Sequence, residues 1–71
     1  MEVPRDVSGA EAAKALERLG FVVNRQVGSH IRMAKGSIRV TIPNHKTILP
    51  KTLQTALRQA GVALEDFLNN L

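Results

Sequence analysis

The sequence predicts an α+β two-layer sandwich, in which a helix, a three-stranded antiparallel sheet and a second long helix are followed by a short C-terminal helix. Two observations predict this fold. Apolar residues recur with helical spacing towards both ends of the chain, whereas residues 30–42 largely alternate between polar and apolar side chains, as strands do. Both long helices should then cover one face of the sheet and leave the other face open.

The first helix is predicted for about residues 9–19. Ser8 and Glu11 have the spacing of a capping box, in which the hydroxyl and the carboxylate each accept a hydrogen bond from a free backbone amide. An apolar stripe follows at i, i+4 and i+7, formed by Ala12, Leu16 and Leu19. Gly20 comes next and can adopt the positive φ that often ends a helix.

Three strands are predicted to form an antiparallel meander, over residues 21–26, 30–33 and 37–42. The first ends at Val27-Gly28, and the turn after the second contains Gly36 as its left-handed residue. Pro43 should end the third strand, because proline has no N–H to donate to a neighbouring strand.

Alternation along the strands sorts their side chains between the two faces of the sheet. The face predicted to enter the core carries Ile31, Met33, Ile38, Val40 and Ile42. The open face carries His30, Arg32, Arg39 and Thr41. We expect His30 to lie one strand repeat from Arg32 and across from Arg39.

Two further helices complete the predicted fold. Pro50 suits the first position of a helix whose apolar stripe is formed by Leu53, Ala56, Leu57 and Ala60, and Gly61 should end it. The short last helix has its apolar positions at Leu64, Phe67, Leu68 and Leu71.

Length and composition restrict the class of protein. The 71 residues suffice for one domain, over residues 1–71, and there is no cysteine for a disulfide or a thiolate metal site. No apolar run approaches the about 18 residues that a membrane helix needs. The N-terminal residues have no hydrophobic stretch of the signal-peptide type. We therefore expect a cytoplasmic protein without a membrane partner or a small-molecule cofactor.

Charge is distributed unevenly along the chain, with ten Lys and Arg against six Asp and Glu. No acidic residue occurs between Arg18 and Leu64, and this stretch holds eight cations. The flanking residues have a net charge of −4, so the overall +4 comes from the centre of the chain. A block of one sign favours a polyanionic partner such as a nucleic acid, although a basic surface without function is the simpler alternative.

Several kinds of catalytic site are disfavoured by the residues present. All the carboxylates lie in the flanks, at Glu2, Asp6, Glu11, Glu17, Glu65 and Asp66, so the basic sheet offers no oxygen ligands for a two-metal nuclease. The two histidines lack ligand spacing, and the glycines match no phosphate-binding loop. Ser29 is adjacent to His30 in the chain, but neighbouring strand residues point to opposite faces, so a role in a turn is the better interpretation.

General acid–base catalysis by histidine remains compatible with the sequence. RNA supplies its own nucleophile, the 2′-hydroxyl, and an imidazole can accept that proton or donate one to the leaving 5′-oxygen. Nearby cations would stabilise the charge that builds up on the phosphate. His30 lies in the middle of the acid-free stretch, so a catalytic role competes evenly with that of an ordinary solvent-exposed histidine. With no Trp or Tyr and both Phe in apolar patterns, stacking of bases is not expected.

An ordered set of short motifs resembles the HicA-type (YcfA/HicA) mRNA interferase toxins. The resemblance extends from about residue 8 to residue 70. Its segments are Gly20-Phe21, Arg25-Gln26-Val27-Gly28-Ser29-His30, Val40-Thr41-Ile42-Pro43-Asn44-His45, Pro50-Lys51-Thr52-Leu53, Arg58-Gln59-Ala60-Gly61 and Leu64-Glu65-Asp66-Phe67-Leu68. No single segment is specific to this family, but the ordered set of segments is.

The resemblance implies a double-stranded-RNA-binding-domain-like fold and a metal-independent endoribonuclease that cleaves mRNA. It also implies a type II toxin–antitoxin system, in which a HicB-like antitoxin inhibits the toxin. The family's catalytic histidine, which belongs to a Gly-Ser-His motif, falls on His30, and the histidine of the family's Pro-x-His motif falls on His45. We therefore expect His30 to be catalytic and RNA to contact Arg25, Ser29, Arg32, Lys35, Arg39, His45, Lys46 and Lys51.

The chain departs from the family pattern at two positions. Lys51 stands where the family usually has glycine, which adds a cation suited to phosphate, and Ala63 stands where a Ser or Thr usually caps the final helix. A non-catalytic double-stranded-RNA-binding module is the main alternative, since it would share the fold and the charge. A protein-interaction subunit without enzymatic activity explains neither the acid-free stretch nor the Gly28-Ser29-His30 motif.

Overall fold

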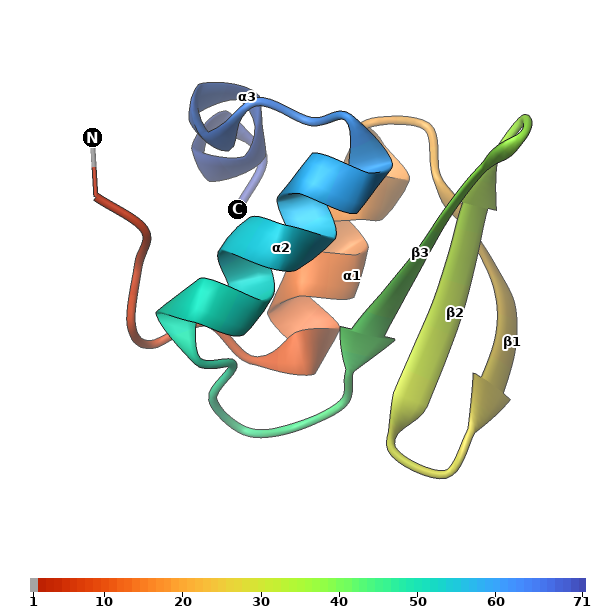
Figure 1. The fold of residues 1–71 in the computed structure, drawn as a ribbon, viewed down its shortest axis with the longest axis horizontal. Coiled ribbons are helices and arrows are strands. Elements are labelled where there is room, and N and C mark those ends of the chain that lie inside the picture. The colour runs from red at the N-terminus through yellow and green to blue at the C-terminus, as the bar shows by residue number, and fades with distance from the viewer. Residues whose placement is uncertain (1) are drawn as a thin grey trace.

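The computed structural model describes residues 2–71 as a three-stranded sheet with its helices packed on one side (Figure 1). The elements in chain order are α1 (Gly9–Arg18), β1 (Val22–Val27), β2 (His30–Lys35), β3 (Ile38–Pro43), α2 (Pro50–Ala60) and α3 (Leu64–Asn69). The sheet is antiparallel with the strand order β1-β2-β3. The predicted fold class, an α+β sandwich, is therefore confirmed.

The ends of the long helices follow the signals in the sequence. The Ser8 hydroxyl accepts a hydrogen bond from the Glu11 amide at 3.1 Å, and the Glu11 carboxylate accepts one from the Ser8 amide at 2.9 Å. The predicted capping box is thus present, although α1 ends at Arg18 and Leu19 serves as its C-cap. Pro50 occupies the first turn of α2, and Gly61, at φ 68°, ends that helix in the left-handed conformation.

The core lies between the sheet and the helices. Its fully buried large side chains are Leu16, Met33, Ile42, Ile48, Leu53 and Phe67. Phe67 comes from α3 and, together with the partly buried Leu64 and Leu68, packs the short helix against the rest of the core. Burial of Ile31, Met33, Val40 and Ile42 confirms the predicted inward face of β2 and β3.

Ile38 is an exception to the predicted core, because its side chain is 40% exposed. It begins β3 opposite Lys35, and the β2–β3 turn next to it projects past the helices (Figure 1). The alternation of the strand is correct there, but the position of Ile38 at the end of the strand, next to the turn, leaves its side chain partly exposed.

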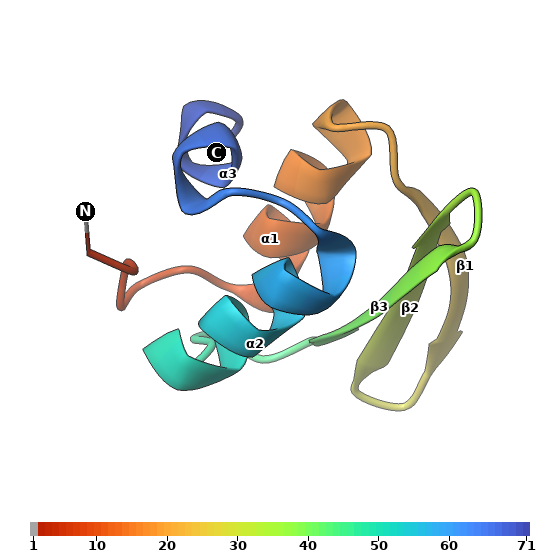
Figure 2. The same ribbon diagram turned by 45° about the horizontal axis from the view of Figure 1, so that its top comes forward.

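The first strand is also more exposed to solvent than its apolar residues suggest. All six residues of β1 are exposed, and Figure 2 shows β1 as the strand farthest from the helices. Val23, paired with the buried Met33, is 47% exposed. Phe21, predicted to begin the strand, instead precedes it and is buried.

Among residues 2–71, every helix is too short or too polar to cross a lipid bilayer.

Candidate catalytic and nucleic-acid-binding face

The face of the sheet turned away from the helices, called the open face below, is organised in three rows by the strand register. One end row contains Val27, His30 and Pro43, and the middle row contains Arg25, Arg32 and Thr41. The row at the other end contains Val22, Ala34 and Arg39. No carboxylate belongs to any of the three rows.

His30 begins β2 at one end of the open face, where three segments meet. It follows a two-residue turn in which Gly28 has a φ of 59°, and it pairs with Val27 on one side and Pro43 on the other. Just beyond that pair, the Asn44 amide donates a hydrogen bond to the Ser29 carbonyl at 2.6 Å. The His30 side chain is exposed, so its imidazole is accessible from solvent.

The register corrects one expectation about the neighbours of His30. Arg39 pairs with Ala34 and not with His30, because the β2–β3 turn consists of only two residues, Gly36 and Ser37. Four residues along a strand separate His30 from Ala34, which places the Arg39 row about 13 Å away. Arg32, about 6.7 Å along the same strand, belongs to the row next to His30.

The middle row places two cations directly opposite each other. Arg25 and Arg32 are a cross-strand pair, and both are exposed. Like charges opposite each other destabilise an antiparallel pair, and no acidic residue on the open face offsets them. A bound polyanion would remove this repulsion, which makes the middle row a suitable place for phosphate.

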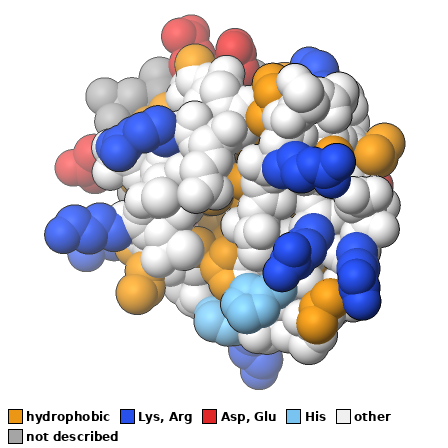
Figure 3. Space-filling view, turned by 45° about the vertical axis from the view of Figure 1, so that its right-hand side comes forward, with side chains coloured by type: hydrophobic (Ala, Val, Ile, Leu, Met, Phe, Trp, Pro, Cys, Tyr) orange, Lys and Arg blue, Asp and Glu red, His pale blue; other side chains and the backbone are white. Residues whose placement is uncertain are grey.

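His45 comes close to His30 through the loop between β3 and α2, two residues after Pro43. Its carbonyl accepts a hydrogen bond of 2.8 Å from the Gly9 amide at the start of α1. A Cβ on Gly9 would lie 2.7 Å from the Asn44 Cα and still closer to the Pro43 carbonyl oxygen, so only glycine fits. In Figure 3 the two histidine side chains form one pale-blue patch on a face that also carries several Lys and Arg.

Two of the central cations are instead used within the fold. The Lys35 Nζ donates a hydrogen bond to the Leu19 carbonyl at 2.8 Å and lies 5.8 Å from the centre of the Phe21 ring. The Arg18 guanidinium donates to the Asn70 carbonyl at 2.6 Å, which joins α1 to the end of α3. Lys35, one of the predicted RNA contacts, therefore lies outside the open face and stabilises the C-terminal end of α1.

The remaining predicted contacts lie in three different segments. Ser29 lies in the turn before His30, and the exposed Lys46 lies in the loop after His45. Lys51 is exposed in the first turn of α2. The structure thus groups Ser29, His30 and His45 at one end of the open face, with Arg25 and Arg32 in the adjacent middle row.

A groove between β3 and α2 adds residues that were absent from the predicted contacts. It has a volume of about 550 Å³, and its lining includes Thr41, Lys51, Thr52, Thr55, Arg58 and Gln59. Thr41 belongs to the open face as well, so the groove continues directly from it. The positions of Thr52, Thr55 and Gln59 at i, i+3 and i+7 are the polar counterpart of the apolar stripe on α2, a signal that could have identified them.

Among residues 2–71, no three histidine or acidic side chains are grouped closely enough to hold a metal ion.

Comparison with known proteins identifies the family of this chain. A search of curated proteins finds no significant match. The sequence model of a family described as the HicA toxin of bacterial toxin–antitoxin systems matches residues 9–62, which is more than half of the chain. That segment includes α1, the whole sheet and α2, and therefore the open face with His30. The chain belongs to the HicA toxin family of bacterial toxin–antitoxin systems.

Proposed function

We propose that this toxin is an endoribonuclease that cleaves messenger RNA without a metal ion, with His30 as the residue that moves the reacting proton. One observation carries the proposal. An exposed imidazole stands at the end of a face whose next row holds two opposed arginines and whose rows contain no carboxylate. Such a face attracts a phosphate and supplies a proton-transferring group beside it.

The proposed reaction uses the 2′-hydroxyl of the RNA as the nucleophile. His30 accepts its proton as the 2′-oxygen bonds to the adjacent phosphorus, and the bond from phosphorus to the 5′-oxygen breaks. The departing 5′-oxygen takes up a proton from solvent water, and the other product ends in a 2′,3′-cyclic phosphate. Arg32, in the row next to His30, stabilises the charge on the phosphate oxygens in the transition state.

The partner of the toxin follows from its family. A toxin of a toxin–antitoxin pair has an antitoxin, and we propose that this antitoxin is HicB-like and covers the open face. Occupying that face would both block access to His30 and offset the charge of the arginines. We place the toxin in the cytoplasm, where messenger RNA is translated.

The test of the catalytic proposal is the His30→Ala variant. We expect it to lose cleavage of a single-stranded RNA and to lose toxicity on induced expression. Its free energy of unfolding should change by no more than about 0.5 kcal/mol, because the side chain is exposed. Cleavage by the folded variant at the wild-type rate would contradict the proposal.

Two controls define the chemistry. Cleavage should persist in excess EDTA, and a DNA strand of the same sequence should stay intact because it has no 2′-hydroxyl. Restoration of EDTA-inhibited activity by magnesium or manganese would show that a metal takes part. Binding of RNA without any cleavage by the wild-type protein would favour the non-catalytic RNA-binding module.

A further inference from the structure

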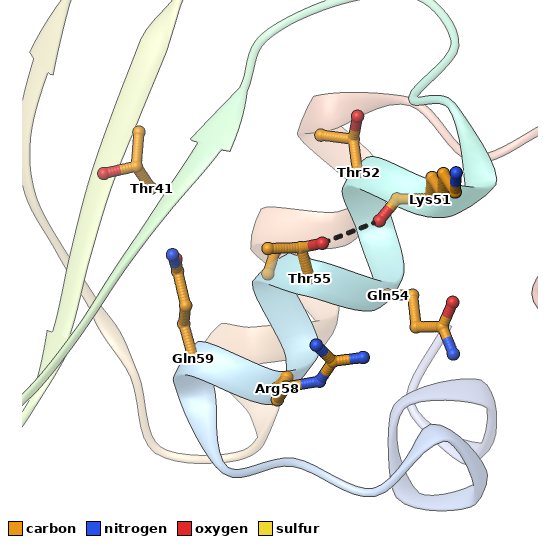
Figure 4. Close-up of a pocket in the computed structure, with 8 residues that line it drawn as sticks. Thr41, Lys51, Thr52, Gln54, Thr55, Arg58 and Gln59 are labelled. Carbon is orange, nitrogen blue, oxygen red and sulfur yellow. Dashed lines mark hydrogen bonds between the residues drawn. The ribbon is translucent and has the colours of Figure 1, made fainter.

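The groove between β3 and α2 is a second surface, lined mainly by polar residue types, that the proposed reaction does not use. Figure 4 shows Thr52, Thr55 and Gln59 on the side of α2 that faces β3, with Thr41 across from them on the strand. Lys51 and Arg58 lie farther round the helix. Ala56, 4% exposed, is the small residue of α2 in the lining.

The polar groups of the groove are available to a ligand. Among residues 2–71, Thr55 is the one lining side chain with an internal hydrogen bond, which its hydroxyl donates to the Lys51 carbonyl at 3.0 Å. The Thr55 oxygen can still accept hydrogen bonds, and Thr41, Thr52 and Gln59 can both donate and accept them. Lys51 and Arg58 add two positive charges, and no lining residue is acidic.

The composition of the groove discriminates between kinds of ligand. Pockets for small molecules and the centres of protein interfaces are mainly apolar, with aromatic or large aliphatic anchors. This groove contains no aromatic residue and no large aliphatic one. Hydroxyls, amides and cations without carboxylates are instead the groups that contact the phosphates and sugars of nucleic acids.

The groove also has a fixed relation to His30. Thr41 lines it and at the same time pairs with Arg32 in the middle row of the open face. Along β3, Thr41 lies two residues, or about 6.7 Å, before Pro43, the partner of His30. A strand of RNA lying across the end of the sheet at His30 would therefore continue past Thr41 into the groove.

We propose that the groove between β3 and α2 binds the sugar–phosphate backbone of the RNA strand that is cleaved at His30, at nucleotides next to the scissile phosphate. This inference rests on the proposed ribonuclease function and names a binding site for its substrate. Lys51 and Arg58 bind phosphates, and Thr52, Thr55 and Gln59 bind ribose and phosphate oxygens. The groove contributes affinity and positioning and takes no part in proton transfer.

The test compares two variants, one with a new negative charge in the groove and a control with a new negative charge outside it. Thr52→Glu adds a carboxylate in the first turn of α2, where the helix dipole favours it, and Ala10→Glu does so at an exposed position in the first turn of α1. Both variants change the net charge equally. They are made in the His30→Ala background, and the Kd for a short single-stranded RNA of mixed sequence is measured by fluorescence anisotropy.

We expect Thr52→Glu to raise this Kd by about tenfold, because a carboxylate repels the phosphate that a hydroxyl contacted, and Ala10→Glu to change it by less than about twofold. With His30 intact, Thr52→Glu should raise KM and leave kcat nearly unchanged. If Thr52→Glu does not fold, Gln59→Glu is a nearly isosteric replacement. Its control is Gln26→Glu, at an exposed position of β1 paired with Ile31 and thus off the open face.

The outcomes separate this inference from the proposed function. Equal effects of the groove and control variants on Kd would overturn it, even if His30→Ala abolishes cleavage as expected. An unchanged RNA affinity together with lost co-purification of the antitoxin would show that the groove binds protein instead. If the groove variants weaken RNA binding but His30→Ala still cleaves RNA fully, the groove is an RNA-binding site and the catalytic proposal is wrong.

Discussion

Arg25 and Arg32 form a cross-strand pair of like charges that, in the proposed function, serves RNA binding at the expense of stability. The two guanidinium groups are opposed on the open face, and Thr41 is the neighbour of Arg32 on the other side. Folding brings these charges together without a compensating carboxylate, so the pair destabilises the free protein. The same arrangement is favourable once phosphate occupies the face.

Arg25→Thr should therefore change stability and RNA binding in opposite directions. We expect the free energy of unfolding to rise by about 0.2–1 kcal/mol at low salt, because the like-charge pair is removed. The slope of log Kd against log salt should flatten by about 0.7 for the lost phosphate contact. Arg39→Thr is the matched control, because Arg39 pairs with Ala34 and its loss should leave stability nearly unchanged. Equal stability changes in the two variants would contradict this account.

Gly9 is a second single residue with a structural role, because its amide donates a hydrogen bond to the carbonyl of His45 in the loop between β3 and α2. Replacing it with alanine usually favours a helix, by up to about 1 kcal/mol. Here the added methyl group would collide with the backbone of Pro43 and Asn44. We expect Gly9→Ala to destabilise the protein by about 1–3 kcal/mol and to reduce cleavage by the molecules that remain folded. Thermal unfolding and single-turnover cleavage would measure the two effects, and a stabilised variant would disprove the close approach.

Among the secondary-structure elements, α1 begins with a capping box whose contribution to stability depends on pH. Hydrogen bonds from the Ser8 amide and hydroxyl hold the pKa of the Glu11 carboxyl below its ordinary value of 4.5. A carboxyl with a lowered pKa stabilises the folded state above its unfolded pKa, and this contribution disappears as the pH falls through the folded pKa. The start of α1 should therefore weaken only in acid.

Glu11→Gln tests this linkage. The variant should be less stable than the wild type at neutral pH, and the difference should shrink as the pH falls below 4.5. Urea unfolding at a series of pH values would measure it, with Glu17→Gln as the control for loss of a carboxylate from the same helix. A stability difference that is independent of pH would show that the ionised carboxylate of Glu11 is not the stabilising form.

The edge strand β1 shows how an exposed element can resist unwanted pairing. Its register shifts between Val23 and Arg25, so Asn24 forms a bulge, and Arg25 places a charge in the middle of the strand. Both features discourage another strand from adding to the sheet, although Val22, Val23 and Val27 are exposed.

At the scale of the whole molecule, the fold separates cations that bind RNA in our proposal from cations that stabilise structure. Arg18 and Lys35 bind backbone carbonyls at the C-terminal ends of helices. Arg25, Arg32 and Arg39 stay on the open face, which no element of residues 2–71 covers (Figure 2). This face is the one that an inhibitor must cover if His30 is catalytic.

We expect the antitoxin to present an acidic surface to the open face. Association should slow at high salt, and Arg32→Glu should slow it further, because opposite potentials speed the encounter. Lys14→Glu, at an exposed position on α1, is the control. Hydrogen exchange on the complex should show protection in the strands around His30. Protection confined to α1 and α2, with RNA cleavage still blocked, would refute this mode of inhibition.

Local patterns in the sequence predict the order of the elements, the ends of the long helices to within a residue and most of the core. The capping box at Ser8, the turn glycines and the period of the apolar residues are local signals, because each depends on residues close together in the chain. Alternation also assigned His30 and Arg32 to the open face correctly, because the faces of a strand depend only on residue parity.

The contacts between residues of different elements could not be predicted from these local patterns. The two-residue turn after Lys35 sets the register between β2 and β3, which places Arg39 far from His30. The bulge in β1 sets the register between β1 and β2, which places Arg25 opposite Arg32. Lys35 binds the end of α1 because the chain brings Leu19 within reach of its ammonium group. The groove exists because α2 packs beside β3, which a one-dimensional pattern does not contain. The exact length of a turn sets the register of a hairpin, and the packing of one element on another sets which side chains meet. The period of the apolar residues within one segment specifies neither.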